Sequence, residues 1–93
     1  MYNILIIDDE RAIRRALREI LELEDYEVYE ATDGKDALDK IKQQVFDLIF
    51  CDIKMPKMDG LEFLTKSKEI SSAPIVMISG HGTIETAVES LKM

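Results

Sequence analysis

The stretch Ile4-Leu5-Ile6-Ile7-Asp8-Asp9 runs from branched apolar residues directly into two acids, and Asp47-Leu48-Ile49-Phe50-Cys51-Asp52 repeats the pattern later in the chain. Short apolar runs bounded by charge are typical of strands buried on both faces of a parallel sheet. In such sheets the ligand crevice lies beyond the carboxyl ends of the strands. We therefore expect Asp8, Asp9 and Asp52 to converge at one rim, where three carboxylates call for a cation.

Strand and helix patterns alternate along the whole chain. We expect strands at about 4–7, 27–31, 47–51 and 75–78, and helices at about 10–23, after Asp33, at about 60–68 and after Thr83. This alternation predicts an α/β fold in which helices cover both faces of a parallel sheet. The weakly apolar second strand suits an edge and the first and third strands suit the centre, so the expected strand order is 2-1-3-4.

The helices carry expectations about which residues face the core. In the first helix the apolar residues recur at helical spacing: Ile13, Ala16, Leu17, Ile20 and Leu21. Its arginines are expected on the solvated outer face: Arg11, Arg14, Arg15 and Arg18. Asp33 is expected to cap the second helix, with Asp36 in its first turn. The third helix is expected to bury Leu61 and Leu64.

Composition excludes several classes of function. The chain has 93 residues, which fits one domain, and a net charge of −7 argues against direct contact with nucleic acid or an anionic membrane. The single cysteine, Cys51, rules out a disulfide within the chain. No apolar run approaches the roughly 20 residues of a membrane span, and no basic segment of a signal peptide precedes the first strand. We therefore expect a cytoplasmic protein.

A second motif follows the third predicted strand, at Asp52-Ile53-Lys54-Met55-Pro56-Lys57-Met58-Asp59-Gly60. Together with Asp8-Asp9, this D-x-x-M-P-x-M-D-G string resembles the receiver domain of two-component response regulators. The resemblance covers the chain in order and spacing, and implies a flavodoxin-like, doubly wound parallel sheet. It also implies a signalling protein rather than an enzyme. The run at 78–83, Ile-Ser-Gly-His-Gly-Thr, resembles receivers of nitrogen-regulation type transcriptional activators.

The resemblance assigns a role to each matching residue. Asp52 corresponds to the phosphoacceptor, and Asp8 and Asp9 correspond to the acidic pair that holds Mg²⁺. The backbone carbonyl of Lys54 would be a further metal ligand. Ser79 corresponds to the switch residue whose hydroxyl turns toward the phosphoryl group. Oxygen ligands of this kind are the ones that Mg²⁺ prefers.

The resemblance also implies partners. A sensor histidine kinase or a phosphotransfer protein would supply the phosphoryl group. Phosphorylation would shift the Ser79 loop and the helix after it, and so control an output domain in the parent chain that is expected to bind DNA. The receiver segment itself is expected to contact neither nucleic acid nor membrane.

The C-terminal end departs from the family pattern. The family carries a lysine at the end of a fifth strand and an aromatic switch residue on that strand, and the 93 residues end before both. We therefore expect residues 1–93 to form a receiver domain truncated at its C-terminal end, without the fifth strand and the last helix. Two copies of the chain could then form a dimer through the exposed sheet edge or through the helix expected after Thr83.

Three other functions occur on a sheet of similar topology. A receiver-like interaction module would keep the fold without being phosphorylated. A phosphatase with an aspartyl nucleophile typically needs a second Asp two residues later, where this chain has Lys54. A flavin carrier would need a phosphate loop rich in Gly, Ser and Thr after the first strand, and Asp8-Asp9-Glu10-Arg11 would repel a phosphate instead.

Overall fold

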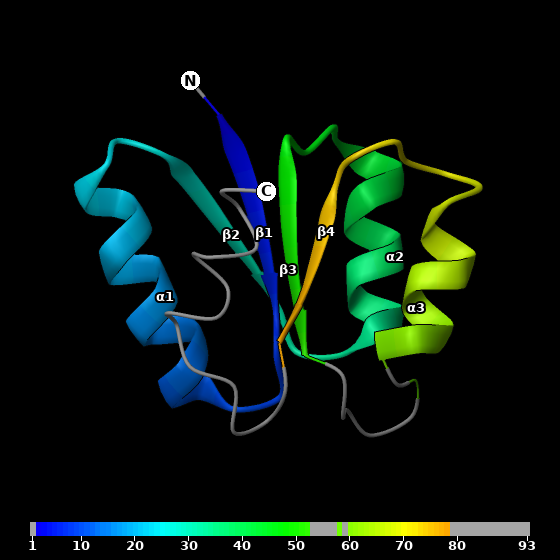
Figure 1. Ribbon diagram of the computed structural model, residues 1–93, viewed down its shortest axis with the longest axis horizontal. Coiled ribbons are helices and arrows are strands. Elements are labelled where there is room, and N and C mark those ends of the chain that lie inside the picture. Colours follow the sequence, from blue (N-terminus) through cyan, green and yellow to red (C-terminus); the bar gives the residue numbers. More distant parts are fainter. Residues whose placement is uncertain (1, 53–57, 59, 79–93) are drawn as a thin grey trace.

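The computed structural model describes residues 2–52, 58 and 60–78. Its elements, in chain order, are β1 (Asn3–Ile7), α1 (Arg11–Leu23), β2 (Glu27–Ala31), α2 (Gly34–Gln43), β3 (Leu48–Asp52), α3 (Gly60–Ser67) and β4 (Ile75–Ile78). The strands of this part of the chain form one parallel sheet in the order β2-β1-β3-β4 (Figure 1). The predicted order is confirmed. β3 lies one residue further along than predicted, so that Asp52 is its last residue.

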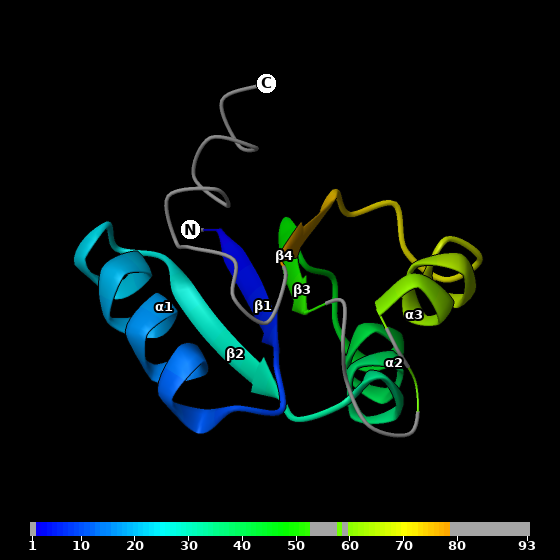
Figure 2. The ribbon, with the colours of Figure 1, turned by 60° about the horizontal axis from the view of Figure 1, so that its bottom comes forward.

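Helices cover both faces of the sheet, with α1 on one side and α2 and α3 on the other (Figures 1 and 2). Alternate residues of the central strands point to opposite faces. The side of α2 and α3 receives Leu5, Ile7, Ile49 and Cys51. The side of α1 receives Ile4, Ile6 and Phe50. Burial on both faces explains why these strands read as continuous apolar runs.

The inner face of α1 is narrower than its apolar pattern predicts. Leu17 and Leu21 are buried, but Ile20 is 42% exposed. The prediction that all four arginines lie on a solvated face is wrong for Arg14, whose side chain is only 12% exposed. Arg14 lies between α1 and β2, where it pairs with Glu30. Its long side chain lets an arginine near the helix boundary reach back over the sheet.

The inner face of α3 also differs from the prediction. Phe63 is fully buried and Ser67, four residues later, is 1% exposed, whereas Leu64 is half-buried. Residues four apart share a helix face, so Phe63 and Ser67 define the side turned to the sheet. The bulkier aromatic side chain occupies the core position instead of Leu64. The side chain of Leu61 lies outside the described residues.

Local capping signals are confirmed at the second helix. The carboxylate of Asp33 accepts a hydrogen bond of 2.8 Å from the backbone N–H of Asp36. A cap of this type contributes about 1 kcal/mol to stability. After α1 ends, Asp25 adopts a left-handed backbone with φ of 64°. Aspartate tolerates this conformation better than most residues, so the turn into β2 is formed without a glycine.

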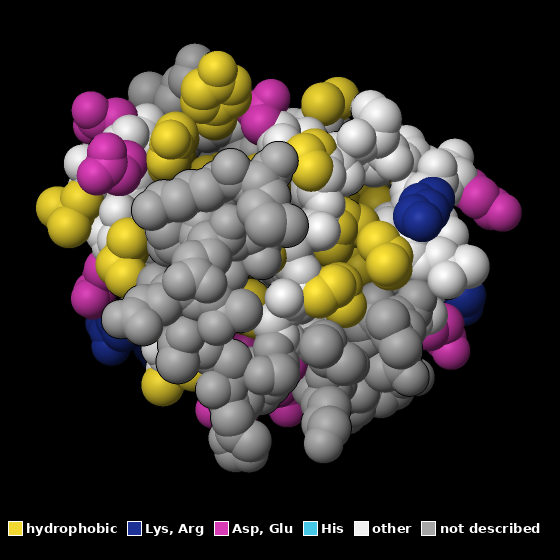
Figure 3. Space-filling view, in the orientation of Figure 1, with side chains coloured by type: hydrophobic (Ala, Val, Ile, Leu, Met, Phe, Trp, Pro, Cys, Tyr) yellow, Lys and Arg dark blue, Asp and Glu magenta, His cyan; other side chains and the backbone are white. Residues whose placement is uncertain are grey.

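Exposed apolar side chains are scattered over the described surface. Tyr2 is 62% exposed, Leu23 83% and Val45 82%, and they come from different parts of the chain. On the face shown in Figure 3, some hydrophobic side chains lie apart from one another and others gather to the right of the centre. Isolated exposed apolar residues are ordinary on protein surfaces. Within the described residues, no helix has the length and apolar character needed to cross a membrane.

Gly34, the first residue of α2, is packed against Met58. A Cβ at this position would lie 2.8 Å from Sδ, 3.0 Å from Cγ and 3.1 Å from Cβ of Met58. Because Cβ and Cγ of a methionine move less freely than its methyl end, the clash could be relieved only by shifting the segment that carries Met58. Gly34 therefore allows a close approach between the start of α2 and Met58.

We predict that Gly34→Ala destabilises the chain by about 1 kcal/mol, because overpacking outweighs the better helix propensity of alanine. In a Met58→Ala background the same substitution should be neutral or stabilising. Urea unfolding of the four proteins of this double-mutant cycle would measure the coupling. An equal effect of Gly34→Ala in both backgrounds would contradict the packing argument.

Candidate functional site

The register of the central strands brings three acids together. Ile6 pairs with Phe50 and Ile7 with Cys51. Asp8, the first residue after β1, therefore comes next to Asp52, the last residue of β3. Each of Asp8, Asp9 and Asp52 offers a carboxylate oxygen, and these oxygens all lie within 4.8 Å of one another. The structure thus gathers the acids that the sequence analysis singled out.

Asp8 is held from several directions. Its N–H donates to the carbonyl of Ala31 at 3.2 Å, which extends the pairing of β1 with β2. Its Oδ1 accepts from the N–H of Glu10 at 2.8 Å, and its carbonyl accepts from Nη1 of Arg14 at 2.8 Å. The side chain therefore both shapes the entry to α1 and contributes to the acidic cluster.

Burial differs among the three acids. Asp8 and Asp52 are each 2% exposed, whereas Asp9 is exposed. Asp52 ends β3 and stands in register with Ile78, the last residue of β4. The cluster is therefore buried on the side of the sheet and open on the side of Asp9. An ion or an anionic group could approach from that open side.

The electrostatics of the cluster favour a cation. Burial raises the pKa of Asp8 from 3.8 to about 6. The hydrogen bond from Glu10 opposes this shift, and the charges of Asp52 and Asp9 reinforce it. Two carboxylates at such a separation repel each other by roughly 3 kcal/mol at an effective dielectric constant near 20. Three carboxylate oxygens that repel one another at this distance suit a hard divalent cation, whose charge would remove the repulsion.

Lys54 and Ser79 lie outside the described residues, and so does the helix expected after Thr83. Of the D-x-x-M-P-x-M-D-G string, only Asp52, Met58 and the backbone of Gly60 are described. Ser79 directly follows Ile78, the register partner of Asp52. The roles of Lys54 and Ser79 stay predictions.

The sequence analysis missed the role of Arg14, which contacts this region, and of its partner Glu30. Nε of Arg14 donates to Oε1 of Glu30 at 2.9 Å, while Nη1 reaches the carbonyl of Asp8. One signal could have found the pair. Glu30 lies two residues after Val28, which is buried under α1, so strand alternation places both on the face that carries Arg14.

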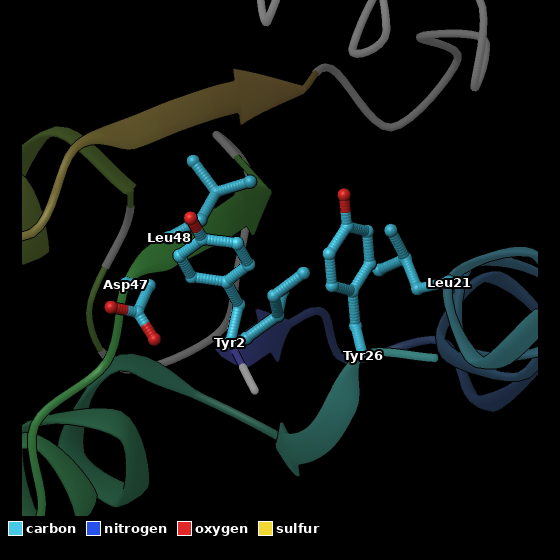
Figure 4. Close-up of a pocket in the computed structure, with 6 residues that line it drawn as sticks. Tyr2, Leu21, Tyr26, Asp47 and Leu48 are labelled. Carbon is cyan, nitrogen blue, oxygen red and sulfur yellow. The ribbon is translucent and has the colours of Figure 1, made fainter. Parts of the chain in front are cut away.

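A separate hollow lies at the opposite end of the sheet, near the amino ends of the strands. It has a volume of about 320 Å³ and is lined mainly by apolar side chains, among them Leu21, Leu48 and the rings of Tyr2 and Tyr26 (Figure 4). Asp47 also lines it, but its Oδ2 already accepts from the N–H of Asn3 at 2.7 Å. The hollow offers no group of converging acids, so the chemistry is assigned to the other end.

Comparison with known sequences agrees with the fold. The response regulator receiver domain family matches residues 4–93. The transcriptional regulatory protein ZraR of Escherichia coli K12 is 37% identical over 91 residues, covering 97% of this chain and 21% of ZraR. The transcriptional regulatory protein SrrA of Staphylococcus aureus is 37% identical over 90 residues, covering 97% of this chain and 37% of SrrA. The chain therefore spans only a minor part of each of these relatives.

Solved structures give the same result. A CheY-like response regulator receiver domain protein from Methanospirillum hungatei superposes with a TM-score of 0.84 at 38% identity, covering 99% of this chain and 74% of that chain. The response regulator TrrA from Thermotoga maritima, solved in complex with Mg²⁺-BeF, has a TM-score of 0.82 at 36% identity, covering 87% of this chain and 71% of that chain. The family match and the shared flavodoxin-like sheet lead to one conclusion: the chain belongs to the response regulator receiver domain family of two-component signalling.

Proposed function

We propose that this chain is a phosphorylation-dependent signalling switch in which Asp52 accepts a phosphoryl group from a sensor histidine kinase or a phosphotransfer protein. The observation that carries the proposal is the position of Asp52. Its buried carboxylate ends a central strand and lies within 4.8 Å of the carboxylates of Asp8 and Asp9. Ligands bind beyond the carboxyl ends of the strands in sheets of this kind, and Asp52 lies at such an end.

The chemistry is the formation of an acyl phosphate. A carboxylate oxygen of Asp52 attacks the phosphorus, and the bond from phosphorus to the histidine nitrogen of the donor breaks. That nitrogen keeps the bonding electrons and takes up a proton. Asp8, Asp9, Asp52 and the carbonyl of Lys54 would hold Mg²⁺, which when bound offsets the negative charge shared by the carboxylate and the phosphoryl oxygens. The Mg²⁺-BeF complex of TrrA supports this assignment by analogy.

The switch step follows from the neighbour of Asp52 across the sheet. In this proposal the hydroxyl of Ser79 donates a hydrogen bond to a phosphoryl oxygen. A new dianion at Asp52 then draws the Ser79 loop and the helix after it toward the site. The register of Asp52 with Ile78 supports the idea, because Ser79 is the next residue of the chain.

The names of the relatives support a proposal about the output of the switch. ZraR and SrrA are both named transcriptional regulatory proteins, and each is much longer than this chain. We propose that the receiver controls an output domain that binds DNA, while the acidic receiver itself does not. We also propose that it acts in the cytoplasm and as a signalling protein rather than an enzyme. An aspartyl phosphatase is disfavoured because Lys54 stands where the second Asp of such enzymes would be.

The role of Asp52 as phosphoacceptor can be tested by phosphorylating the chain. Acetyl phosphate and Mg²⁺ should add the mass of one phosphoryl group to the chain, and Asp52→Asn should abolish the gain because it removes the nucleophile. Asp39→Asn, at an exposed position of α2, is the matched control and should leave the gain intact. Intact-protein mass spectrometry measures the outcome. A gain that survives in Asp52→Asn would refute the assignment, and a wild-type chain without any gain would favour the unphosphorylated interaction module.

Binding of Mg²⁺ should stabilise the folded chain. A ligand at tenfold its dissociation constant adds about 1.4 kcal/mol of stability, so saturating Mg²⁺ should raise the melting temperature by about 5 °C or more. Asp9→Asn should reduce this shift, because one of the converging carboxylates is lost. Asp39→Asn should show the wild-type shift. Calorimetric melting curves at several Mg²⁺ concentrations provide the measurement, and an unchanged melting temperature would count against the metal site.

The pKa of Asp8, which is raised from 3.8 to about 6 in the folded chain, makes stability depend on pH. Between these two values the folded state binds more protons at this group than the unfolded state does. The free energy of unfolding without metal should therefore fall as the pH rises through this window, by about 1–2 kcal/mol after solvent screening.

Asp8→Asn should remove this contribution. The quantity to compare is the difference between the variant and the wild type in urea unfolding at about pH 4 and about pH 7, with a chelator present. The variant should gain in relative stability at the higher pH. An identical pH profile for the two proteins would show that Asp8 does not carry the effect.

A further inference from the structure

The guanidinium of Arg14 joins two parts of the chain that lie far apart in sequence. It donates from Nε to Oε1 of Glu30 in β2 at 2.9 Å and from Nη1 to the carbonyl of Asp8 at 2.8 Å. Its side chain is 12% exposed. A single, largely covered side chain thus connects the edge strand β2 with the loop that carries Asp8 and Asp9.

A positive charge at this place needs an explanation. A guanidinium bound to the backbone carbonyl of Asp8 places a positive charge near the site, and this charge opposes the binding of a cation through Coulomb repulsion. Glu30 offsets this charge, since it pairs with both Arg14 and Arg18, and Arg18 pairs in turn with Glu22 at 3.3 Å. The four side chains together carry no net charge, so charge alone gives Arg14 no favourable role at the site.

The ionisation of Glu30 agrees with this balance. Burial alone would raise the pKa of Glu30, but its hydrogen bonds with Arg18 and Arg14 outweigh burial and hold the pKa below its usual value. Glu30 is therefore a stable anionic anchor near neutral pH. An anchored guanidinium is a rigid donor, because its planar fork fixes the direction of each N–H group.

We propose that Arg14 is a positioning residue that, anchored on Glu30, orients the Asp8–Asp9 peptide group so that both carboxylates face the metal site. The peptide group is planar, so fixing the carbonyl of Asp8 also fixes the N–H of Asp9 and the direction in which the chain continues. Asp9 is exposed, and its place in the cluster depends on that direction. This inference rests on the proposed function and assigns to it a residue outside the acidic trio.

The geometry requires an arginine. Two different nitrogens of one guanidinium serve two acceptors on different elements, at 2.9 and 2.8 Å. A lysine keeps the charge but presents all its N–H groups from one nitrogen at the end of a flexible stem. Lysine at position 14 could therefore satisfy Glu30 or the carbonyl of Asp8 without orienting both.

Arg18 provides a matched control. It lies one turn further along α1, carries the same charge and pairs with the same Glu30, yet its described hydrogen bonds go to Glu22 and Glu30 and not to Asp8. Arg14→Lys and Arg18→Lys both keep the charge and both disturb the contact with Glu30. Only Arg14→Lys disturbs the bond to the carbonyl of Asp8.

The experiment is a calorimetric titration of Mg²⁺ into the metal-free chain and its variants. Arg14→Lys should raise the dissociation constant for Mg²⁺ about tenfold. This is the lower end of the loss in affinity caused by mutating residues that hydrogen-bond to metal ligands and orient them. Arg18→Lys should stay within about twofold of the wild type, since it leaves the bond to Asp8 in place. Arg14→Gln should also weaken binding, although the loss of a positive charge would by itself strengthen it.

A spectroscopic measurement separates positioning from a general loss of stability. The amide nitrogen of Asp9 belongs to the same peptide group as the carbonyl of Asp8, so its nitrogen resonance reports on the bond from Arg14. That resonance should move in metal-free Arg14→Lys and remain in place in Arg18→Lys. Melting temperatures of both variants should be recorded in parallel.

The outcomes are distinct. Wild-type chain with no saturable response to Mg²⁺ would overturn the proposed metal site and this inference together. Wild-type binding that Arg14→Lys leaves unchanged would overturn the inference and leave the proposed function standing. Equal weakening in Arg14→Lys and Arg18→Lys would also overturn it, because disturbance of Glu30 would then be the cause. If Arg14→Gln fails to fold, the comparison of the two lysine variants decides.

Discussion

The parallel pairing of β1 with β3 is the constraint on which the site depends. It sets Ile7 beside Cys51 and thereby Asp8 near Asp52. A slip of one residue would turn every side chain of a strand to the opposite face. Each fully buried aliphatic side chain contributes roughly 1.5–3 kcal/mol, so one or two of them offset the roughly 3 kcal/mol by which two of the acids repel. Apolar packing therefore holds together carboxylates that would otherwise separate.

The parts of the fold that follow from local patterns could be predicted from the sequence. The central strands are continuous apolar runs, the cap at Asp33 is a short-range signal, and the ends of β1 and β3 carry their acids in the chain itself. The faces of the helices were predicted less well. Periodicity shows that a helix has an apolar side, but not how far the sheet extends beneath it, so Ile20 is exposed and Phe63 replaces Leu64 in the core.

The same contrast between local patterns and long-range contacts applies to the site. Asp8, Asp9 and Asp52 could be found because their position depends only on where strands end. Arg14 could not be found from its own helix, since its burial depends on a glutamate sixteen residues away on another element. A charged residue near a helix boundary can point to water or across the sheet, and only its partner decides which. The assignments of Lys54 and Ser79 still rest on the family resemblance.

The sheet also has a consequence for how the chain can change. Each central strand contributes alternate side chains to two clusters, one with α1 and one with α2 and α3, and the backbone between them acts as a partition. A loss of volume at Ile6 cannot be filled from the side of Ile7, although the two residues are neighbours in sequence. Compensation must come from the same compartment, so adjacent positions of one strand evolve under the demands of two different interiors.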